Sequence, residues 1–476
     1  MLPPGIPNGQ LEPQRNETLD GHLTMKDSTG QVVYTGTVAV NPLTRLSRGM
    51  AGAMMAASGP TEATLPVSID VIDENTAKIT IEDQQLQLRK GEWSEIIELR
   101  FKVGILLSAH AITRMILTNM NGIIHLYALP LQIHPLHSIW HYSSSRSFAK
   151  NLWDKVGPYL TLGWPQDTTG LEEGCITDEQ FLNLCQMIFE RRKQIFFYLM
   201  KDFREGVLAG VFDCLDRVQH MFFRERPDIA KEWYEQLDGF VGEVQEQMTN
   251  WDGKHRFLVL SDHGFSPFVQ KIHLNRWLAD HGYLALKDGL ASGDLSNVDW
   301  TKTQAYAVGL NSIYLNVYGR EGQGIVNADE VENLLTDIKE QLSTWKAADG
   351  NFVIHKIHMK HEIYSGPYTR FGPDLMVGYA SGYRASPETG LGKIPEKIIE
   401  PNYDHWGADH CMDSEIVPGV IFANCDLQDF GNISFRDIPF LAIGKHLDQS
   451  HLKPPSQREG QGQKDVEERL KGLGYL

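Results

Sequence analysis

Aspartate and histidine residues stand close together at three places in the second half of the chain, and these side chains could do chemistry. In chain order they are Asp216 with His220, Asp262 with His263, and the run of Asp404, His405, Asp409 and His410. Carboxylate and imidazole groups without a thiolate are a ligand set that suits Zn²⁺ or Mn²⁺. The residue types therefore predict a centre for divalent cations.

The spacing of Asp216 and His220 fits a helix. Residues four apart face the same side of a helix, so these two side chains could bind one ion. Such a spacing more often belongs to an exposed ion pair than to a metal site, so Asp216 and His220 alone are weak evidence for metal binding. Cys214 and Cys411 stand near the proposed ligands, but small buried residues are their expected role.

Asp262 and His263 directly follow the apolar run from Phe257 to Leu260, which predicts a short, fully buried strand. Gly264 then frees the next turn. Open α/β sheets bind ligands at this position, beyond the carboxyl ends of their strands. The alternative is an ordinary surface turn that happens to contain an aspartate and a histidine.

The elements around these groups determine whether they can meet. An apolar run at 207–212 predicts a strand, and 228–248 predicts a long amphipathic helix that leads into the strand at 257–260. Strand, helix and strand form a βαβ unit, so the two strands should be parallel and end at the same edge of a sheet. The third group precedes a strand expected at 417–422, which predicts that all three groups lie at one edge.

The remaining sequence divides by pattern. Alternating and β-branched segments from Leu65 to Pro135 predict strands, with a hairpin turn at Asn119–Gly122. Thr177 and Gln180 form a possible capping box at the start of a long helix. Helices and strands then alternate. The expected domains are a poorly defined lead (1–60), a β-rich insertion module (61–137), an α/β domain (138–447) and a polar tail with a short helix (448–476).

Composition narrows the classes of function. The 476 residues are 42% apolar and carry a formal net charge of −17, which argues against non-specific binding to nucleic acid or anionic membranes. Five cysteines form no CxxC pair, so reduced thiols are expected. The first residues lack the pattern of a signal peptide, and no apolar segment is long enough to span a bilayer. The expected location is cytoplasmic, and the oligomeric state is left open.

Several longer segments resemble a known family. They include VFDCLDRVQHMF, VLSDHGF, FGPDLMVGYASGYR and ADHCMDSEIVPGVIFAN. Together they resemble the type I phosphodiesterase/nucleotide pyrophosphatase branch of the alkaline phosphatase superfamily. The resemblance implies an α/β fold with a mostly parallel sheet flanked by helices, and a β-rich insertion near the N-terminus. It also implies hydrolysis of phosphodiester or pyrophosphate bonds in a small phosphorylated substrate.

The resemblance further implies two divalent cations, Zn²⁺ or Mn²⁺, which clamp the phosphoryl oxygens at a separation of about 4 Å. Asp216, His220 and His410 would bind one ion, and Asp262 with His263 would bind the second. His410 fits the family pattern better than His405, because it directly precedes the CMD segment. His405 and Asp409 would then lie beside the ligands.

No nucleophile is found. The family carries a Thr or Ser nucleophile and a further Asp ligand on an N-terminal strand and helix, and neither could be assigned in this sequence. We therefore expect the chain to be a C-terminal fragment of such an enzyme. Two alternatives stay open: a sulfatase or phosphonate hydrolase of the same superfamily, and a non-catalytic metal-binding remnant.

Overall fold

The computed structural model describes residues 26–27, 32–40, 63–103, 107–121, 124–138, 142–427 and 433–444. The chain divides into two compact units. The first contains the described residues up to Arg204 together with Leu208–Cys214, and the second contains Glu205–Val207 and the described residues from Leu215 onward. Among these residues, no helix combines the length and apolar content that crossing a membrane would require. The predicted tail at 448–476 lies outside the described residues.

The first unit contains the predicted β-rich segment. One antiparallel sheet has the strand order β1 (Lys26–Asp27), β2 (Val32–Val40), β3 (Ala63–Asp73), β4 (Thr76–Ile81) and β5 (Gln84–Arg89). A second has the order β10 (Gln132–Ile133), β7 (Leu107–Thr113) and β6 (Ile97–Val103). Alternate residues of β4 are buried, as expected for a strand with one face in a core. The predicted hairpin is confirmed as the antiparallel pair β8 (Met115–Asn119) and β9 (His125–Ala128).

Three described helices belong to the same unit: α4 (Arg146–Val156), α5 (Thr168–Glu172) and α6 (Asp178–Asp202). The capping box predicted for α6 is confirmed, because the Thr177 side chain accepts from the Gln180 amide and the Gln180 side chain accepts from the Thr177 amide. Phe181 and Cys185 on the predicted face are fully buried. The predicted boundary at residue 137 stays a prediction, because strands and helices on both sides of it form one compact unit.

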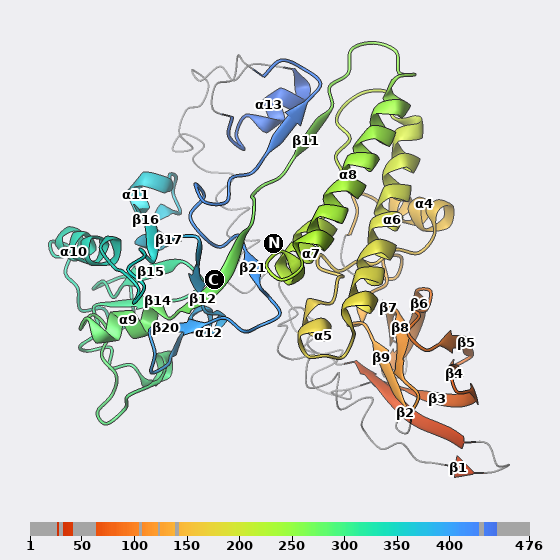
Figure 1. Cartoon of the computed structure of the whole chain (residues 1–476), viewed down its shortest axis with the longest axis horizontal. Helices are drawn as coiled ribbons and strands as arrows, with labels where there is room; N and C mark the ends of the chain where they lie inside the picture. Colours follow the sequence, from red (N-terminus) through yellow and green to blue (C-terminus); the bar gives the residue numbers. More distant parts are fainter. Residues whose placement is uncertain are drawn as a thin grey trace. The chain divides into compact units, whose positions relative to one another are not determined.

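The second unit is built around a four-stranded antiparallel sheet (Figure 1). Its order is β14 (Ala305–Ala307), β15 (Ser312–Leu315), β17 (Leu375–Tyr379) and β16 (Ile354–Met359). Helices α9 (Leu274–Asp280) and α10 (Val331–Ser343) supply Trp277 and Ile338 to the core of this sheet. Each fully buried side chain of this kind stabilises the fold by roughly 1.5–3 kcal/mol.

A second sheet in this unit positions the candidate site. Its central strand is β12 (Ser266–Ile272), which follows directly after the Asp262–His263 pair. It pairs in parallel with β18 (Gly382–Ala385) and antiparallel with β20 (Ile399–Pro401) and β21 (Ala408–Asp409). Because β21 immediately precedes His410, this pairing brings two of the three predicted ligand groups to one strand.

One predicted element is wrong. Residues 207–212 form no strand, and Val211 is 79% exposed, so the proposed parallel βαβ unit does not exist. The predicted strand after it is present as β11 (Leu258–Leu260), following helix α8 (Pro227–Met248), but it pairs antiparallel with β22 (Ile421–Ala423). Without a neighbour at 207–212, β11 is only partly buried, contrary to the prediction that it is fully buried.

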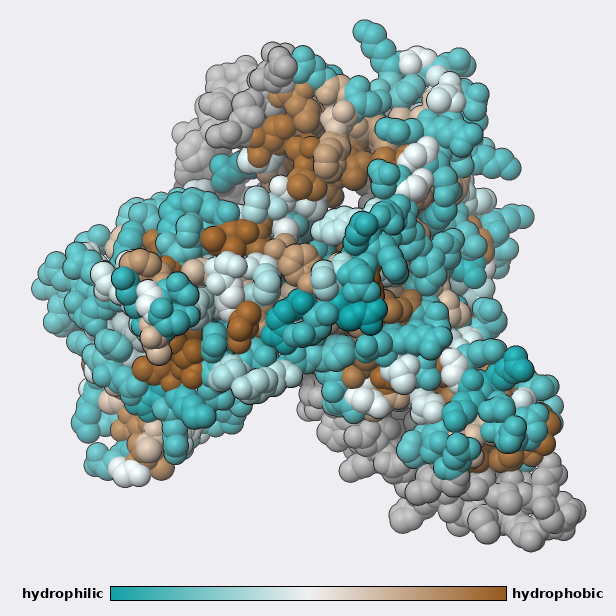
Figure 2. All heavy atoms as spheres, in the orientation of Figure 1, coloured by the Kyte–Doolittle hydropathy of each residue, from teal (hydrophilic) through white to brown (hydrophobic). Residues whose placement is uncertain are grey.

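The prediction of a mostly parallel sheet is also not confirmed. Among the ladders between described strands, only the one between β12 and β18 is parallel. What is confirmed is a mixed α/β architecture. Apolar side chains of β11, β22 and the nearby helix α13 (Ile438–Ile443) stay exposed, namely Leu260, Phe422 and Ile443, and apolar surface is visible over this part of the molecule (Figure 2).

Asp374 immediately precedes β17, and its buried carboxylate allows a test of what stabilises this unit. Its carboxylate accepts hydrogen bonds from Arg320 at 2.6 and 2.8 Å and from the Leu315 amide at 2.8 Å, and its ion pair with Lys360 spans 2.5 Å. Burial alone would raise the pKa of Asp374, but these partners hold it below the usual value of 3.8. The carboxylate therefore stabilises the fold above pH 3.8, and this contribution is lost as pH falls through the lowered pKa.

We predict that Asp374→Asn lowers the free energy of unfolding by about 2 to 4 kcal/mol at pH 7, because it leaves two partly buried cations without their partner. Urea unfolding followed from pH 7 towards pH 3 should show the difference from wild type shrinking in acid. Asp329→Asn, at an exposed position, is the control and should change little. A pH-independent difference would contradict the role given to the Asp374 charge.

Candidate metal centre

The first ligand group lies on α7 (Cys214–Phe222), a short helix that presents Asp216 in its first turn and His220 one turn later. The His220 side chain is only 1% exposed. Its Nδ1 lies 2.9 Å from the carbonyl oxygen of Ala408, and a carbonyl can only accept, so Nδ1 carries the proton. Nε2 is therefore the ring atom whose lone pair could bind a cation, and it lies 3.6 Å from Oδ2 of Asp216.

Strand β21 connects this helix to the other two groups. The Gly407 amide donates to the His220 carbonyl at 2.9 Å, which fixes α7 against the start of β21. On its other side, β21 pairs Asp409 with Ser266 in antiparallel register. Residues that precede Ser266 therefore lie beside residues that follow Asp409. This register brings the turn that carries His263 close to His410.

Gly264 makes the close approach possible. Its amide donates to the Val417 carbonyl at 2.9 Å, and a Cβ at this position would lie 2.9 Å from the carbonyl oxygen of Pro418. Any larger residue would push the turn that carries Asp262 and His263 away from the segment after His410. The glycine is thus needed here for space rather than for an unusual backbone angle.

The ligand atoms converge as a result. The His263 and His410 rings stack with centroids 3.6 Å apart and an interplanar angle of 16°. Their Nε2 atoms lie 3.7 and 3.8 Å from Oδ1 of Asp216. One ligand atom from each of these three residues lies within 4.8 Å of the others. Oδ1 of Asp262 is 3.5 Å from His263 Nε2, on a side chain that is 77% exposed.

The structure therefore brings all five predicted ligands together. The tightest triplet, however, mixes the two predicted sets, since His263 was assigned to the second ion and Asp216 with His410 to the first. Two of the three other residues of the third group point elsewhere: the exposed His405 packs its ring against Phe222, and Asp404 pairs with Lys271 at 2.6 Å. Metal binding itself stays a prediction.

The protonation states suit cation binding. Burial lowers the pKa of His220 to about 3, and burial together with the neighbouring His263 lowers that of His410 to about 4. Both imidazoles are therefore neutral near pH 7, which is the form that binds metals. Oδ1 of Asp216 is buried and accepts no hydrogen bond from the described residues, whereas Oδ2 accepts from Arg217. A cation fits this set of donors.

The two cysteines considered from the sequence differ in their distance from the proposed ligands. Cys411 Sγ lies within 4.8 Å of ligand atoms of Asp409 and His410. Burial and the nearby Asp409 raise the pKa of Cys411 to about 12, so it is a neutral thiol when no cation is bound. Cys214 is fully buried in the first unit. Both observations agree with their expected role as small apolar residues.

Asp409 was expected beside the ligands, but the sequence did not reveal Arg384, the residue that pairs with Asp409. Asp409 is buried, and its Oδ2 accepts from Trp406 Nε1 at 2.7 Å and lies 2.7 Å from Nε of Arg384. Its Oδ1 accepts from the His410 amide at 2.7 Å. Burial raises the pKa of Asp409, but the charge of Arg384, the nearby His220 and the hydrogen bonds from Trp406 and the Cys411 amide together outweigh burial and lower the pKa to about 2. Arg384, on β18, carried no spacing signal that linked it to the ligands.

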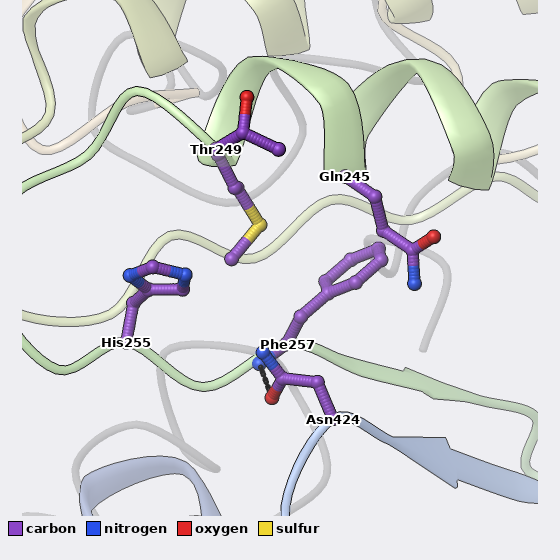
Figure 3. Close-up of a pocket in the computed structure, with 6 residues that line it drawn as sticks. Gln245, Thr249, His255, Phe257 and Asn424 are labelled. Atoms are coloured by element: carbon purple, nitrogen blue, oxygen red, sulfur yellow. Dashed lines mark hydrogen bonds between the residues drawn. The ribbon is translucent and has the colours of Figure 1, made fainter.

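A shallow pocket elsewhere in the second unit is not part of this centre (Figure 3). It lies where α8 ends and β11 begins, and the Phe257 amide donates to Oδ1 of Asn424 there at 2.7 Å. Its lining consists of Gln245, Met248, Thr249, His255, Phe257 and Asn424. With a single titratable side chain, it offers no comparable chemistry.

Comparison with known proteins gives one result. A family model described as type I phosphodiesterase/nucleotide pyrophosphatase matches residues 139–393, which is more than half of the chain. The match includes Asp216, His220, Asp262 and His263 and ends before His410. No curated protein and no solved structure matches. The chain therefore belongs to the type I phosphodiesterase/nucleotide pyrophosphatase family, which indicates a hydrolase of phosphoester bonds.

Proposed function

We propose that this protein is a metal-dependent hydrolase of phosphodiester or pyrophosphate bonds in a small phosphorylated substrate. The observation that supports this proposal most is the convergence of Asp216, His263 and His410 within 4.8 Å of one another. Three segments of the chain supply one carboxylate and two imidazoles to one point. Such a set is costly to assemble and suits Zn²⁺ or Mn²⁺.

Divalent cations held at this point would polarise the phosphoryl oxygens and stabilise the charge that develops during hydrolysis. They would also supply local positive charge to a protein whose net charge is −17. The protein's own residues orient the ligands. His220 is held by the Ala408 carbonyl, and Asp409 fixes the His410 backbone. No nucleophile is assigned to any described residue.

For the two ions we propose the division that the family resemblance implies. Asp216, His220 and His410 would bind one, and Asp262 with His263 would bind the other. The 3.6 Å separation of His220 Nε2 from Asp216 Oδ2 and the 3.5 Å separation of His263 Nε2 from Asp262 Oδ1 support it. Because Asp216 Oδ1 is nearly equidistant from His263 and His410, its carboxylate would lie between the two positions.

The proposed activity predicts that protein stripped of metal by a chelator hydrolyses bis-para-nitrophenyl phosphate only after Zn²⁺ or Mn²⁺ is added. Asp216→Asn or His410→Ala should lower kcat/KM by more than about 100-fold, beyond the about 10–100-fold typical of residues that only orient a ligand. His405→Ala is the matched control, because it removes an exposed histidine from the same segment and should leave kcat/KM nearly unchanged.

The same assay distinguishes the alternatives. Faster hydrolysis of para-nitrophenyl sulfate or of a phosphonate ester than of the diester would indicate the other enzymes of the superfamily. Bound Zn²⁺ without hydrolysis of any of these esters, in a protein that unfolds cooperatively, would indicate a non-catalytic metal-binding protein. Either result would contradict the proposed function.

The buried ion pair between Asp409 and Arg384 predicts an indirect effect on the metal centre. Asp409→Asn should weaken Zn²⁺ binding by about 10–100-fold, because the loop that carries His410 loses its charged anchor although no ligand atom is removed. Isothermal titration with Zn²⁺ measures the change, and circular dichroism verifies that the variant is folded. Asp404→Asn, which breaks a more exposed ion pair in the same segment, is the control. Equal affinities for the folded Asp409→Asn variant and wild type would contradict this role.

A further inference from the structure

Histidine and carboxylate side chains also converge at a second place in the same unit. The Nε2 atom of His355, on β16, lies 3.2 Å from Oε2 of Glu415 and 4.0 Å from Oδ1 of Asp413. One ligand atom of each residue lies within 4.8 Å of the others. Ligands of a tetrahedral Zn²⁺ ion at about 2.0–2.2 Å are roughly 3.3 Å apart, so small side-chain rotations would suffice to bind one.

The backbone of β16 is shaped to present His355. The ladder between β16 and β17 pairs Ile354 with Tyr379 and then Lys356 with Gly378, so His355 is the extra residue of a β-bulge. In a regular strand, residues three apart point to opposite faces. The bulge removes this alternation, so that Ile354 and Ile357 are buried while both His355 and His358 contact carboxylates.

The other side of the site is shaped to receive Asp413. Its side chain is 0% exposed, and a Cβ on Gly378, opposite the bulge, would collide with its carboxyl group. Its amide donates to the Tyr379 carbonyl at 3.1 Å. The glycine and the bulge are features of two neighbouring strands, and both are needed before Asp413 and His355 can approach each other.

Each carboxylate has one oxygen bonded to a neighbouring side chain and the other within 4.0 Å of His355 Nε2. His358 Nε2 lies 2.9 Å from Oδ2 of Asp413. Oδ1 of Asp413 accepts from the Glu415 amide at 3.0 Å and lies 4.0 Å from His355 Nε2. Lys356 donates to Oε1 of Glu415 at 2.7 Å, which leaves Oε2 facing His355. Oriented carboxylates of this kind are typical of metal ligands. A plain ion-pair network would account for the Lys356 contact but would not need the bulge at His355.

We propose that His355, Asp413 and Glu415 form a second binding site for a Zn²⁺-class divalent cation, distinct from the centre around Asp216. The donor set is one imidazole and two carboxylates, and the exposure of Glu415 leaves a coordination position open to water. Asp413 follows His410 by three residues, so the same loop serves both positions. An ion at this site would tie that loop to β16 and stabilise the segment that carries His410.

The test uses the full chain in which Asp216→Asn, His263→Ala and His410→Ala remove the first centre. After removal of metal, equilibrium dialysis against Zn²⁺ with measurement of bound metal should show one equivalent per chain. Adding His355→Ala and Glu415→Gln should remove that equivalent, whereas adding His361→Ala should leave it. His361 is the matched control, because it is an exposed histidine just after β16 on the short helix α11 (Lys360–Ile363).

A second measurement covers the case in which the first set of substitutions prevents folding. His355→Ala with Glu415→Gln, introduced into the otherwise unchanged chain, should lower the bound Zn²⁺ by one equivalent and reduce the rise in Tm that Zn²⁺ produces. Both residues are at the surface, so this variant should fold. Unchanged stoichiometry in this variant, or no Zn²⁺ bound when the first centre is removed from a folded chain, would overturn the proposal.

Discussion

The candidate centre depends on one short strand, β21, and on the register in which its neighbours meet it. The Ala408 carbonyl orients His220, the backbone of Asp409 pairs with Ser266, and the next residue is His410. The Asp409 carboxylate holds the strand in place through Arg384, inside a region with little solvent to weaken the pair. A shift of this register by one residue would turn His410 away from His263. The positions of all three groups of ligands thus depend on how β21 pairs with its neighbours.

The ligands could be predicted from the sequence because they are local features. Each group is an aspartate with a histidine one or four positions away, and such pairs can be read without knowing how the chain folds. The residues that hold them could not. Arg384 and Trp406 contact Asp409 and His220 only because β18 and β21 flank the same strand, β12. Pairing between distant strands leaves no periodic trace in a single sequence.

The fold, too, could be predicted from the sequence only where local features determine it. The helices at 178–202 and 227–248 and the hairpin of β8 and β9 were predictable, because capping residues, helical periodicity and turn residues act within a few positions. The strand expected at 207–212 was wrong, although its residues are apolar. A strand depends on a partner for its hydrogen bonds, and an apolar run does not reveal whether a partner exists. The same reasoning applies to β11. The strand is present as predicted, but it pairs antiparallel and not parallel.

The loop from Asp409 to Glu415 joins His410 to ligands supplied by α7 and by the turn before β12, so the proposed function depends on a cation bound between these elements. Anomalous diffraction at the zinc edge, from crystals of the full chain grown with Zn²⁺, shows whether the cation is bound there. We predict a peak about 2.0–2.2 Å from ligand atoms of both Asp216 and His410. Zinc ordered only elsewhere, with Asp216 and His410 bonded to no ion, would contradict the proposed centre.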